Sequence, residues 1–126
     1  MVLDILAQRF SCYEEGQIVH SGPMSSGTSC DEQGEPRDIY DLEYVVVKKK
    51  IDAYSEMYHV PMPYSVMLGD APGNMAGRKG LIIHYGQLPD YPDSHDCFRL
   101  GLADAKWVFN WAKVGLPVYV INARRP

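Results

Sequence analysis

Apolar positions fall in short runs that are separated by turn residues, and this pattern is typical of a chain of short β-strands. The runs Val2–Tyr13 and Gln17–Pro23 flank the polar connection Glu14–Gly16, whose glycine predicts a β-hairpin. The β-branched run within Tyr40–Ile51 predicts a longer strand. We expect further strands at Tyr64–Leu68, Leu81–His84 and Val118–Ile121.

One segment, Leu102–Val114, has the apolar spacing of an amphipathic helix. Gly115 and Pro117 follow it, and we expect them to end the helix. Trp107 and Trp111 lie four residues apart on this helix, a spacing that favours packing over a ligand platform. The pattern therefore predicts a mainly β fold, with β-sandwich-like mixed sheets and one clear α-helix near the C-terminus.

Length and charge restrict the classes of protein to consider. A chain of 126 residues fits a single domain, which we assign to residues 1–126. The formal net charge of −4 argues against nucleic-acid binding, because that function needs a basic face. No apolar stretch approaches the ~20 residues of a transmembrane segment. The first nine residues do not resemble a signal peptide, so either the protein is cytosolic or the sequence begins after its targeting segment.

The chain has three cysteines, an odd number that leaves at least one thiol free or paired between chains. Cys12 and Cys30 are candidates for a disulfide, although nothing in the sequence fixes their geometry. Cys97 has His95 two residues before it and Arg99 two residues after it. Imidazole and guanidinium groups favour the reactive thiolate, so Cys97 is a candidate nucleophile. The alternative is that Cys97 is a small buried apolar residue.

A metal site is a second alternative for the same cluster, because His84, His95, Asp96 and Cys97 are all ligand types. The usual Cys-x-x-Cys and His-Glu-x-x-His spacings are absent, and the charge of Arg99 would repel a metal ion. We therefore predict no metal and no cofactor.

The order of these residues resembles a known signature. Ile83-His84, a loop, and then Ser94-His95-Asp96-Cys97-Phe98-Arg99-Leu100 closely resemble the signature of the L,D-transpeptidase catalytic domain, with Asp96 in place of the usual Gly. Weaker similarities extend over nearly the whole chain and include Asp4, Gln8, Ser25-Ser26-Gly27, Met62-Pro63-Tyr64 and Gly115-x-Pro117-Val118.

The resemblance implies the fold of this family and acyl transfer through a cysteine thioester on peptidoglycan tetrapeptide stems. It implies that Cys97 is the nucleophile, His84 the general base and the backbone carbonyl of Tyr85 the group that orients His84. It further implies that His95 orients the site and that the backbone N–H of Asp96 stabilises the oxyanion. Substrate-binding roles fall to Arg99, Ser94, Tyr64 and Met62.

The acceptor would be an amine, which gives a 3→3 crosslink or exchange of the terminal D-amino acid, or water, which gives an L,D-carboxypeptidase or a related cell-wall amide hydrolase. A degenerate domain that binds peptidoglycan without turnover is a further alternative, because the Asp96 carboxylate would raise the pKa of a neighbouring thiol. The family also implies a location in the periplasm or cell envelope.

Overall fold

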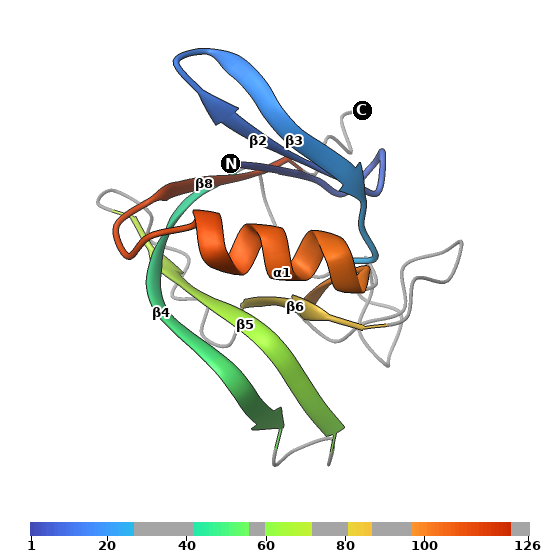
Figure 1. The fold of residues 1–126 in the computed structure, drawn as a ribbon. Helices are drawn as coiled ribbons and strands as arrows, with labels where there is room; N and C mark the ends of the chain where they lie inside the picture. Colours follow the sequence, from blue (N-terminus) through green and yellow to red (C-terminus); the bar gives the residue numbers. More distant parts are fainter. Residues whose placement is uncertain (27–41, 56–59, 72–80, 87–96, 122–126) are drawn as a thin grey trace, which may run out of the picture.

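The computed structural model describes residues 1–26, 42–55, 60–71, 81–86 and 97–121. Within these ranges the chain forms eight strands and one helix (Figure 1). Their bounds are β1 (Val2–Asp4), β2 (Arg9–Glu14), β3 (Gln17–Pro23), β4 (Leu42–Ser55), β5 (Val60–Asp70), β6 (Ile82–Tyr85), β7 (Cys97–Leu100), α1 (Leu102–Trp111) and β8 (Pro117–Ile121).

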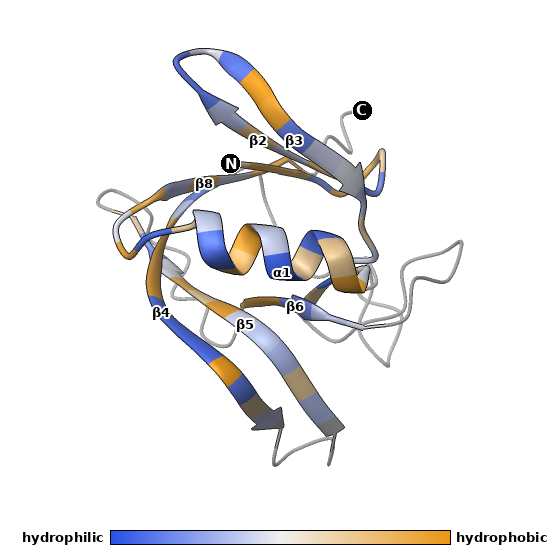
Figure 2. Cartoon of the chain, in the orientation of Figure 1, coloured by the Kyte–Doolittle hydropathy of each residue, from blue (hydrophilic) through white to orange (hydrophobic). Residues whose placement is uncertain are grey.

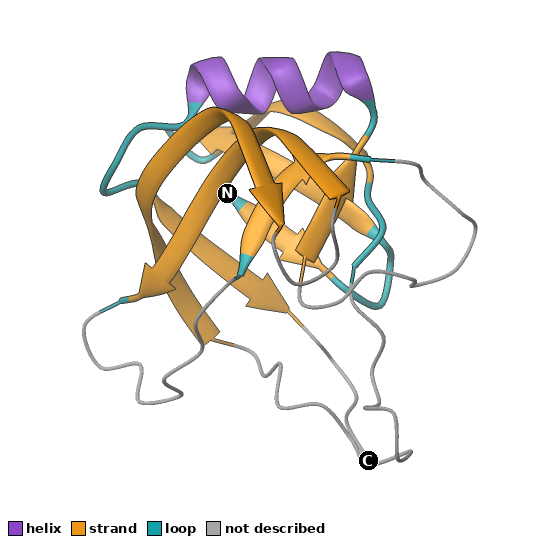
Figure 3. Ribbon diagram, turned by 90° about the horizontal axis from the view of Figure 1, so that it is seen from below, coloured by secondary structure: helices purple, strands orange, loops and turns teal. Residues whose placement is uncertain are grey.

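The strands form a single mixed sheet in the order β3-β2-β1-β8-β4-β5-β6-β7. The pairs β1–β8 and β6–β7 are parallel, and the other neighbours are antiparallel. The sheet curves strongly on itself, as Figure 3 shows. Ser25, just after β3, pairs with Arg99 of β7 through two backbone hydrogen bonds of 3.0 and 2.8 Å. This bridge joins the two edges of the sheet. The prediction of a mainly β fold with one helix near the C-terminus is confirmed.

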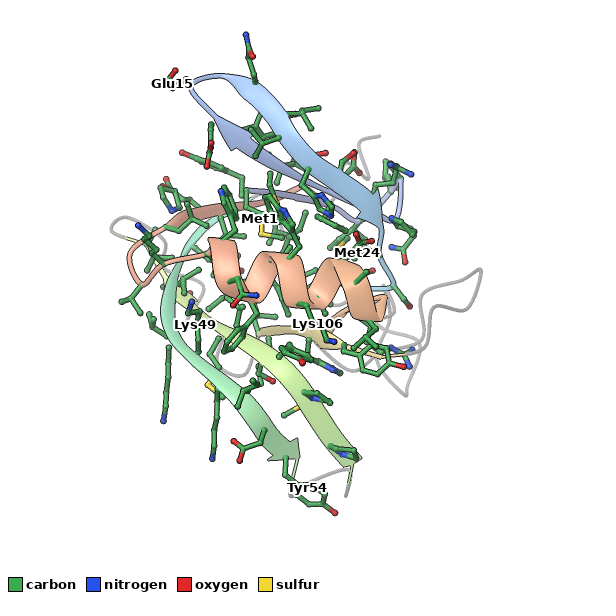
Figure 4. All side chains as sticks on the ribbon, viewed as in Figure 1. Met1, Glu15, Met24, Lys49, Tyr54 and Lys106 are labelled. Carbon is green, nitrogen blue, oxygen red and sulfur yellow. The ribbon has the colours of Figure 1, made fainter. Side chains whose placement is uncertain are left out.

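The predicted N-terminal hairpin is confirmed and forms β2 and β3. Glu15 and Gly16 form its turn, with φ angles of 51° and 78°. Two successive positive φ angles define a type I′ turn, which matches the twist of the flanking strands. Figure 4 shows Glu15 at the outer tip of this hairpin.

Strand β5 is longer than the sequence pattern predicts, because it includes Pro61 and Pro63. Both prolines pair with β4, opposite Tyr54 and Asp52. The described pairs between β5 and β6 involve only Val66 and Met67 of β5. The prolines therefore lie in a part of β5 that extends beyond its described pairing with β6, and such edge positions are the ones that tolerate proline.

The core lies between the curved sheet and α1, which contacts β5, β6 and β7. The helix contributes Ala105, Val108 and, at its C-cap, Ala112. Polar and apolar residues alternate around α1 and along the strands (Figure 2). The largest side chains that are fully buried in the core are Tyr44, Phe10, Phe98, Leu3, Leu81, Ile83 and Leu100.

Helix α1 ends at Trp111, three residues before the predicted end. The next residue, Ala112, has extended backbone angles. Two contacts with β4 explain the early end. Lys49 Nζ donates a 2.7 Å hydrogen bond to the carbonyl of Phe109 in the last turn, and Gly115 N–H donates to the carbonyl of Val46 at 2.7 Å. Figure 4 shows Lys49 beside the helix. In the described part of the chain, no helix is long and apolar enough to cross a membrane.

Candidate active site

The parallel pair β6–β7 brings the two central candidate residues onto neighbouring strands. The backbone of Cys97 pairs with Ile82, and the backbone of His84 pairs with Arg99. Because residues two apart in a strand share a face, positions 97 and 99 lie on the same face of the sheet as His84. Ser94, His95 and Asp96 lie outside the described residues, so their predicted roles stay predictions.

His84 is 7 % exposed, and its ring is held by its neighbour in the chain. The imidazole Nδ1–H donates a 2.6 Å hydrogen bond to the backbone carbonyl of Tyr85. A neutral ring that donates from Nδ1 keeps the lone pair of Nε2, so Nε2 can accept a proton. Burial lowers the pKa of His84, the bond to Tyr85 partly opposes this, and the positive charge of Arg99 lowers the pKa further.

Arg99 is half-buried, and its aliphatic stem passes directly over Gly86. A Cβ atom at Gly86 would lie 2.5 Å from Cδ and 2.9 Å from Cγ of Arg99. The N–H of Gly86 donates to the carbonyl of Leu100 at 3.1 Å, which continues the pairing of β6 with β7. The close approach of the Arg99 side chain to the backbone after β6 therefore requires glycine at position 86. Gly86 is not among the residues predicted from the sequence, where its only signal is a glycine directly after the strand that carries His84.

The two predicted groove residues, Tyr64 and Met62, differ in their surroundings. Tyr64 has a φ of 58°, an uncommon value for a tyrosine within a strand. Its ring meets Phe109 edge-on at 5.7 Å between centroids, and Lys106 Nζ lies 5.8 Å from its centroid. Met62 is buried and pairs with Ala53 in the extension of β5 beyond β6. Tyr64 is thus held under α1, whereas Met62 belongs to the β4–β5 ribbon.

Gln8 fixes the segment that closes the sheet next to β7. Its φ is 52°, and its side-chain Nε2 donates to the carbonyl of Ile5 at 2.6 Å and to Ser26 Oγ at 2.8 Å. Its Oε1 accepts the N–H of Ser26 at 3.0 Å, and its backbone carbonyl accepts the N–H of Met24 at 2.9 Å. Because Ser25 lies between these anchored residues and pairs with Arg99, Gln8 supports the strand that carries Cys97.

Cys12 is a fully buried free thiol. Cys30, its candidate partner in the sequence, lies outside the described residues. Burial raises the pKa of Cys12 to about 12, which makes this thiol unreactive at neutral pH. His20 lies on β3, apart from β6, and its Nε2 forms a 2.7 Å hydrogen bond with Oδ1 of Asp104. Among the described residues, no group of three or more His, Cys, Asp or Glu could hold a metal ion.

The described residues thus combine a curved mixed sheet, the helix α1 and a buried histidine on the strand next to the one that carries Cys97. The sequence profile of the YkuD family, described as the L,D-transpeptidase catalytic domain, matches residues 1–120. The chain therefore belongs to this family. No curated protein matches it.

Solved structures of L,D-transpeptidases share this fold. The enzyme from Mycobacterium smegmatis has a TM-score of 0.75 and 20 % identity, over 96 % of this chain and 57 % of that one. L,D-transpeptidase 1 of Mycobacterium tuberculosis has a TM-score of 0.72 and 20 % identity, over 96 % and 60 %. The Enterococcus faecium protein has a TM-score of 0.69 and 21 % identity, over 95 % and 48 %. The chain thus spans between 48 % and 60 % of the length of these proteins.

Proposed function

We propose that residues 1–126 are a single catalytic domain that transfers acyl groups between peptidoglycan stem peptides, with Cys97 as the nucleophile. The observation that carries this proposal is the geometry of His84. Its Nδ1–H is fixed on the Tyr85 carbonyl at 2.6 Å, so its Nε2 lone pair is the one available to a thiol. The backbone of Cys97 lies on the neighbouring strand, two residues before the register partner of His84. Membership of the L,D-transpeptidase family supports the same assignment.

In the first half-reaction, His84 Nε2 takes the proton of the Cys97 thiol, and the sulfur attacks the carbonyl of the third stem residue, a diaminopimelate. The bond to the terminal D-alanine breaks, the alanine leaves as its amine with the proton from His84, and a thioester remains on Cys97. The Tyr85 carbonyl keeps the imidazole in the tautomer that this step needs, as the third group of a catalytic triad does.

In the second half-reaction, the amine of another stem attacks the thioester, and the thiol regains its proton as the amide forms. The product is a 3→3 crosslink, or an exchanged terminus when the acceptor is a free D-amino acid. We assign the oxyanion site to backbone N–H groups around Cys97, including that of Asp96. In other acyl-transfer enzymes each such donor contributes about 3–4 kcal/mol.

The remaining predicted residues complete the proposed site. Arg99 binds a substrate carboxylate or holds the strand through its packing on Gly86. His95 orients the reacting groups, and Ser94 contacts the donor stem. Tyr64 lies on β5, the strand next to β6, and forms part of the donor groove. Met62 is the weakest member of this set, because its side chain is buried. The substrate places the protein outside the cytoplasmic membrane, in the periplasm or cell envelope.

The test is incubation with purified tetrapeptide muropeptides, with products identified by mass. Crosslinked dimers are the expected result; tripeptides alone would instead indicate an L,D-carboxypeptidase. The Cys97→Ala variant must lose both activities. Cys12→Ala is the matched control, because that thiol is buried and its pKa is raised, and it must keep activity. A fully active Cys97→Ala protein would contradict the proposal.

A second measurement separates an enzyme from a binding domain. One structural neighbour is an L,D-transpeptidase in complex with imipenem. We expect imipenem to add its mass to the wild-type chain and to Cys12→Ala, but not to Cys97→Ala. No adduct in any of the three proteins, together with unchanged muropeptide binding, would indicate a domain without turnover.

A further inference from the structure

A cavity that is widely open to solvent lies away from β6 and β7, between the tip of the β2–β3 hairpin and the C-terminal end of α1. Its volume is about 520 Å³, within the ~300–1,000 Å³ that is usual for small-molecule sites. The residues that line it come from β2, from α1 and from the connection to β8. They are Tyr13, Glu14, Asn110, Trp111, Lys113 and Leu116.

The lining combines aromatic rings with one negatively charged and one positively charged side chain, both of which can form hydrogen bonds. The carboxylate of Glu14 and the ammonium of Lys113 carry opposite charges, so their formal charges cancel. An anion would meet the carboxylate, and a cation would meet the ammonium. The occupant that fits has no net charge, with donors and acceptors along its edge and an apolar face for the rings of Tyr13 and Trp111. A pyranose sugar has this chemistry, with hydroxyl groups at its edge and C–H groups on its faces.

The aromatic part of the cavity is fixed before any ligand binds. The Trp111 ring stacks on Trp107 with centroids 5.4 Å apart and an interplanar angle of 25°. Trp107 in turn stacks on His20 with centroids 4.3 Å apart. The indole N–H of Trp111 donates a 2.8 Å hydrogen bond to Glu14 Oε1, which ties the helix to the hairpin. A ligand that packs against this ring loses little entropy in ordering it, which favours binding.

We propose that this cavity binds an N-acetylhexosamine ring of a glycan strand. The pyranose assignment rests on the lining of the cavity alone, and the choice of N-acetylhexosamine rests on the proposed function. The cavity and β7 lie at opposite ends of α1, a ten-residue helix that is ~15 Å long. Three extended stem residues reach ~10–11 Å, which is less than this length. A sugar in the cavity would therefore belong to a neighbouring part of the glycan strand, not to the unit whose stem reacts at Cys97.

The experiment is a titration of the full chain with chitotriose, the trisaccharide of N-acetylglucosamine, followed by tryptophan fluorescence. The chain has two tryptophans, and both belong to the stacked pair beside the cavity. We expect a saturable change in emission. We expect Tyr13→Ser to weaken binding at least tenfold, and Lys113→Met to weaken it less, because it removes a rim hydrogen bond but no stacking surface.

Tyr54→Ser is the matched control. Tyr54 is 49 % exposed, similar to the 40 % of Tyr13, and Figure 4 shows it at the far end of the β4–β5 ribbon. This variant must bind chitotriose as the wild type does. Circular dichroism and Tm establish that each variant is folded.

Several outcomes would overturn the proposal: no saturable signal in the wild type, equal binding by Tyr13→Ser, or equal loss in Tyr54→Ser. Cellotriose that binds as tightly as chitotriose would overturn the assignment to N-acetylhexosamine. Chitotriose has no stem peptide, so its binding is measured independently of turnover. A chain that processes muropeptides but does not bind chitotriose refutes this inference and leaves the proposed function intact.

Discussion

His84 and Arg99 are direct register partners on the parallel strands β6 and β7, and the charge of Arg99 lowers the pKa of His84. Burial of the imidazole is the larger cause of the same shift. Both effects favour the neutral ring, which is the form that can act as a general base.

The first prediction concerns the pH dependence of the reaction. A lowered pKa means that His84 gains its proton only below 6.5, so the acid limb of kcat/KM against pH should lie below 6.5. Arg99→Gln removes one of the two lowering causes, and the limb should move to higher pH. Lys50→Gln, which removes an exposed charge on β4, should not move it. An acid limb that is the same in wild type and Arg99→Gln contradicts this electrostatic coupling.

The same shift predicts how stability depends on pH. In the unfolded chain His84 has the ordinary histidine pKa, whereas its native pKa is lower. At a pH between the two values, the unfolded chain therefore binds a proton at His84 and the native chain does not. The contribution of His84 to stability is therefore complete above pH 6.5 and is lost as the pH falls below it. Urea unfolding at several pH values should show a shallower acid decline in His84→Gln than in the wild type.

The second prediction concerns Gly86. Gly86→Ala places a Cβ atom 2.5 Å from Cδ of Arg99, which is too close, so the arginine stem must move. We expect kcat/KM to fall about tenfold or more, since small misplacements in an active site are costly. In an Arg99→Ala background Cγ and Cδ are gone and only Cβ remains, at 3.3 Å, so Gly86→Ala should have a much smaller effect. Equal effects of Gly86→Ala in the two backgrounds would disprove the steric explanation.

The third prediction concerns Gln8. Gln8→Ala removes the three side-chain hydrogen bonds that hold Ser26 and Ile5, and it should cost about 1–3 kcal/mol of the free energy of unfolding. Gln8→Gly loses the same bonds but adopts the φ of 52° without strain, so it should be more stable than Gln8→Ala by ~1 kcal/mol. Urea denaturation measures both values. Equal stabilities would show that the backbone at this position is unstrained.

The fourth prediction concerns the buried thiol. The native pKa of Cys12 is raised from 9.0 to about 12, so above pH 9 the unfolded chain loses a proton that the native chain keeps. The stability from this group is complete below pH 9 and falls as the pH rises toward 12. The decline should be shallower in Cys12→Ala. In the native wild type, Cys12 should also resist thiol reagents at pH 8 and react only after unfolding.

Local patterns were sufficient to predict much of the fold. Glycine after two glutamates predicted the β2–β3 hairpin, although not its turn type, and helical spacing of apolar residues predicted α1. Where prediction differed from structure, the cause was a contact with a distant segment. The contact of Lys49 with Phe109 ends α1 early, and the short partner strand β6 lets Pro61 and Pro63 remain in β5.

For the candidate site, residue types and their order predicted His84 and Cys97 as a pair, because the resemblance supplied their roles. Gln8 is among the positions of the resemblance, but its supporting role, like that of Gly86, was not predictable in this way. Gly86 matters only because the stem of Arg99 crosses it, and Gln8 matters because its carboxamide reaches Ser26. Both depend on which strands lie side by side, and a one-dimensional pattern does not contain that information.

The position of β1 in the sheet has a consequence for the order of events during synthesis. Leu3 pairs with Val120 of β8, and the carbonyl of Met1 accepts the N–H of Tyr119 at 2.9 Å. Of the described strands, β1 comes first in the sequence, yet its parallel partner β8 comes last. Until Ile121 has been synthesised, β1 and the β2–β3 hairpin are not joined to β4 through β8. We therefore expect this sheet to close only after β8 has been made, with its edges exposed to chaperones until then.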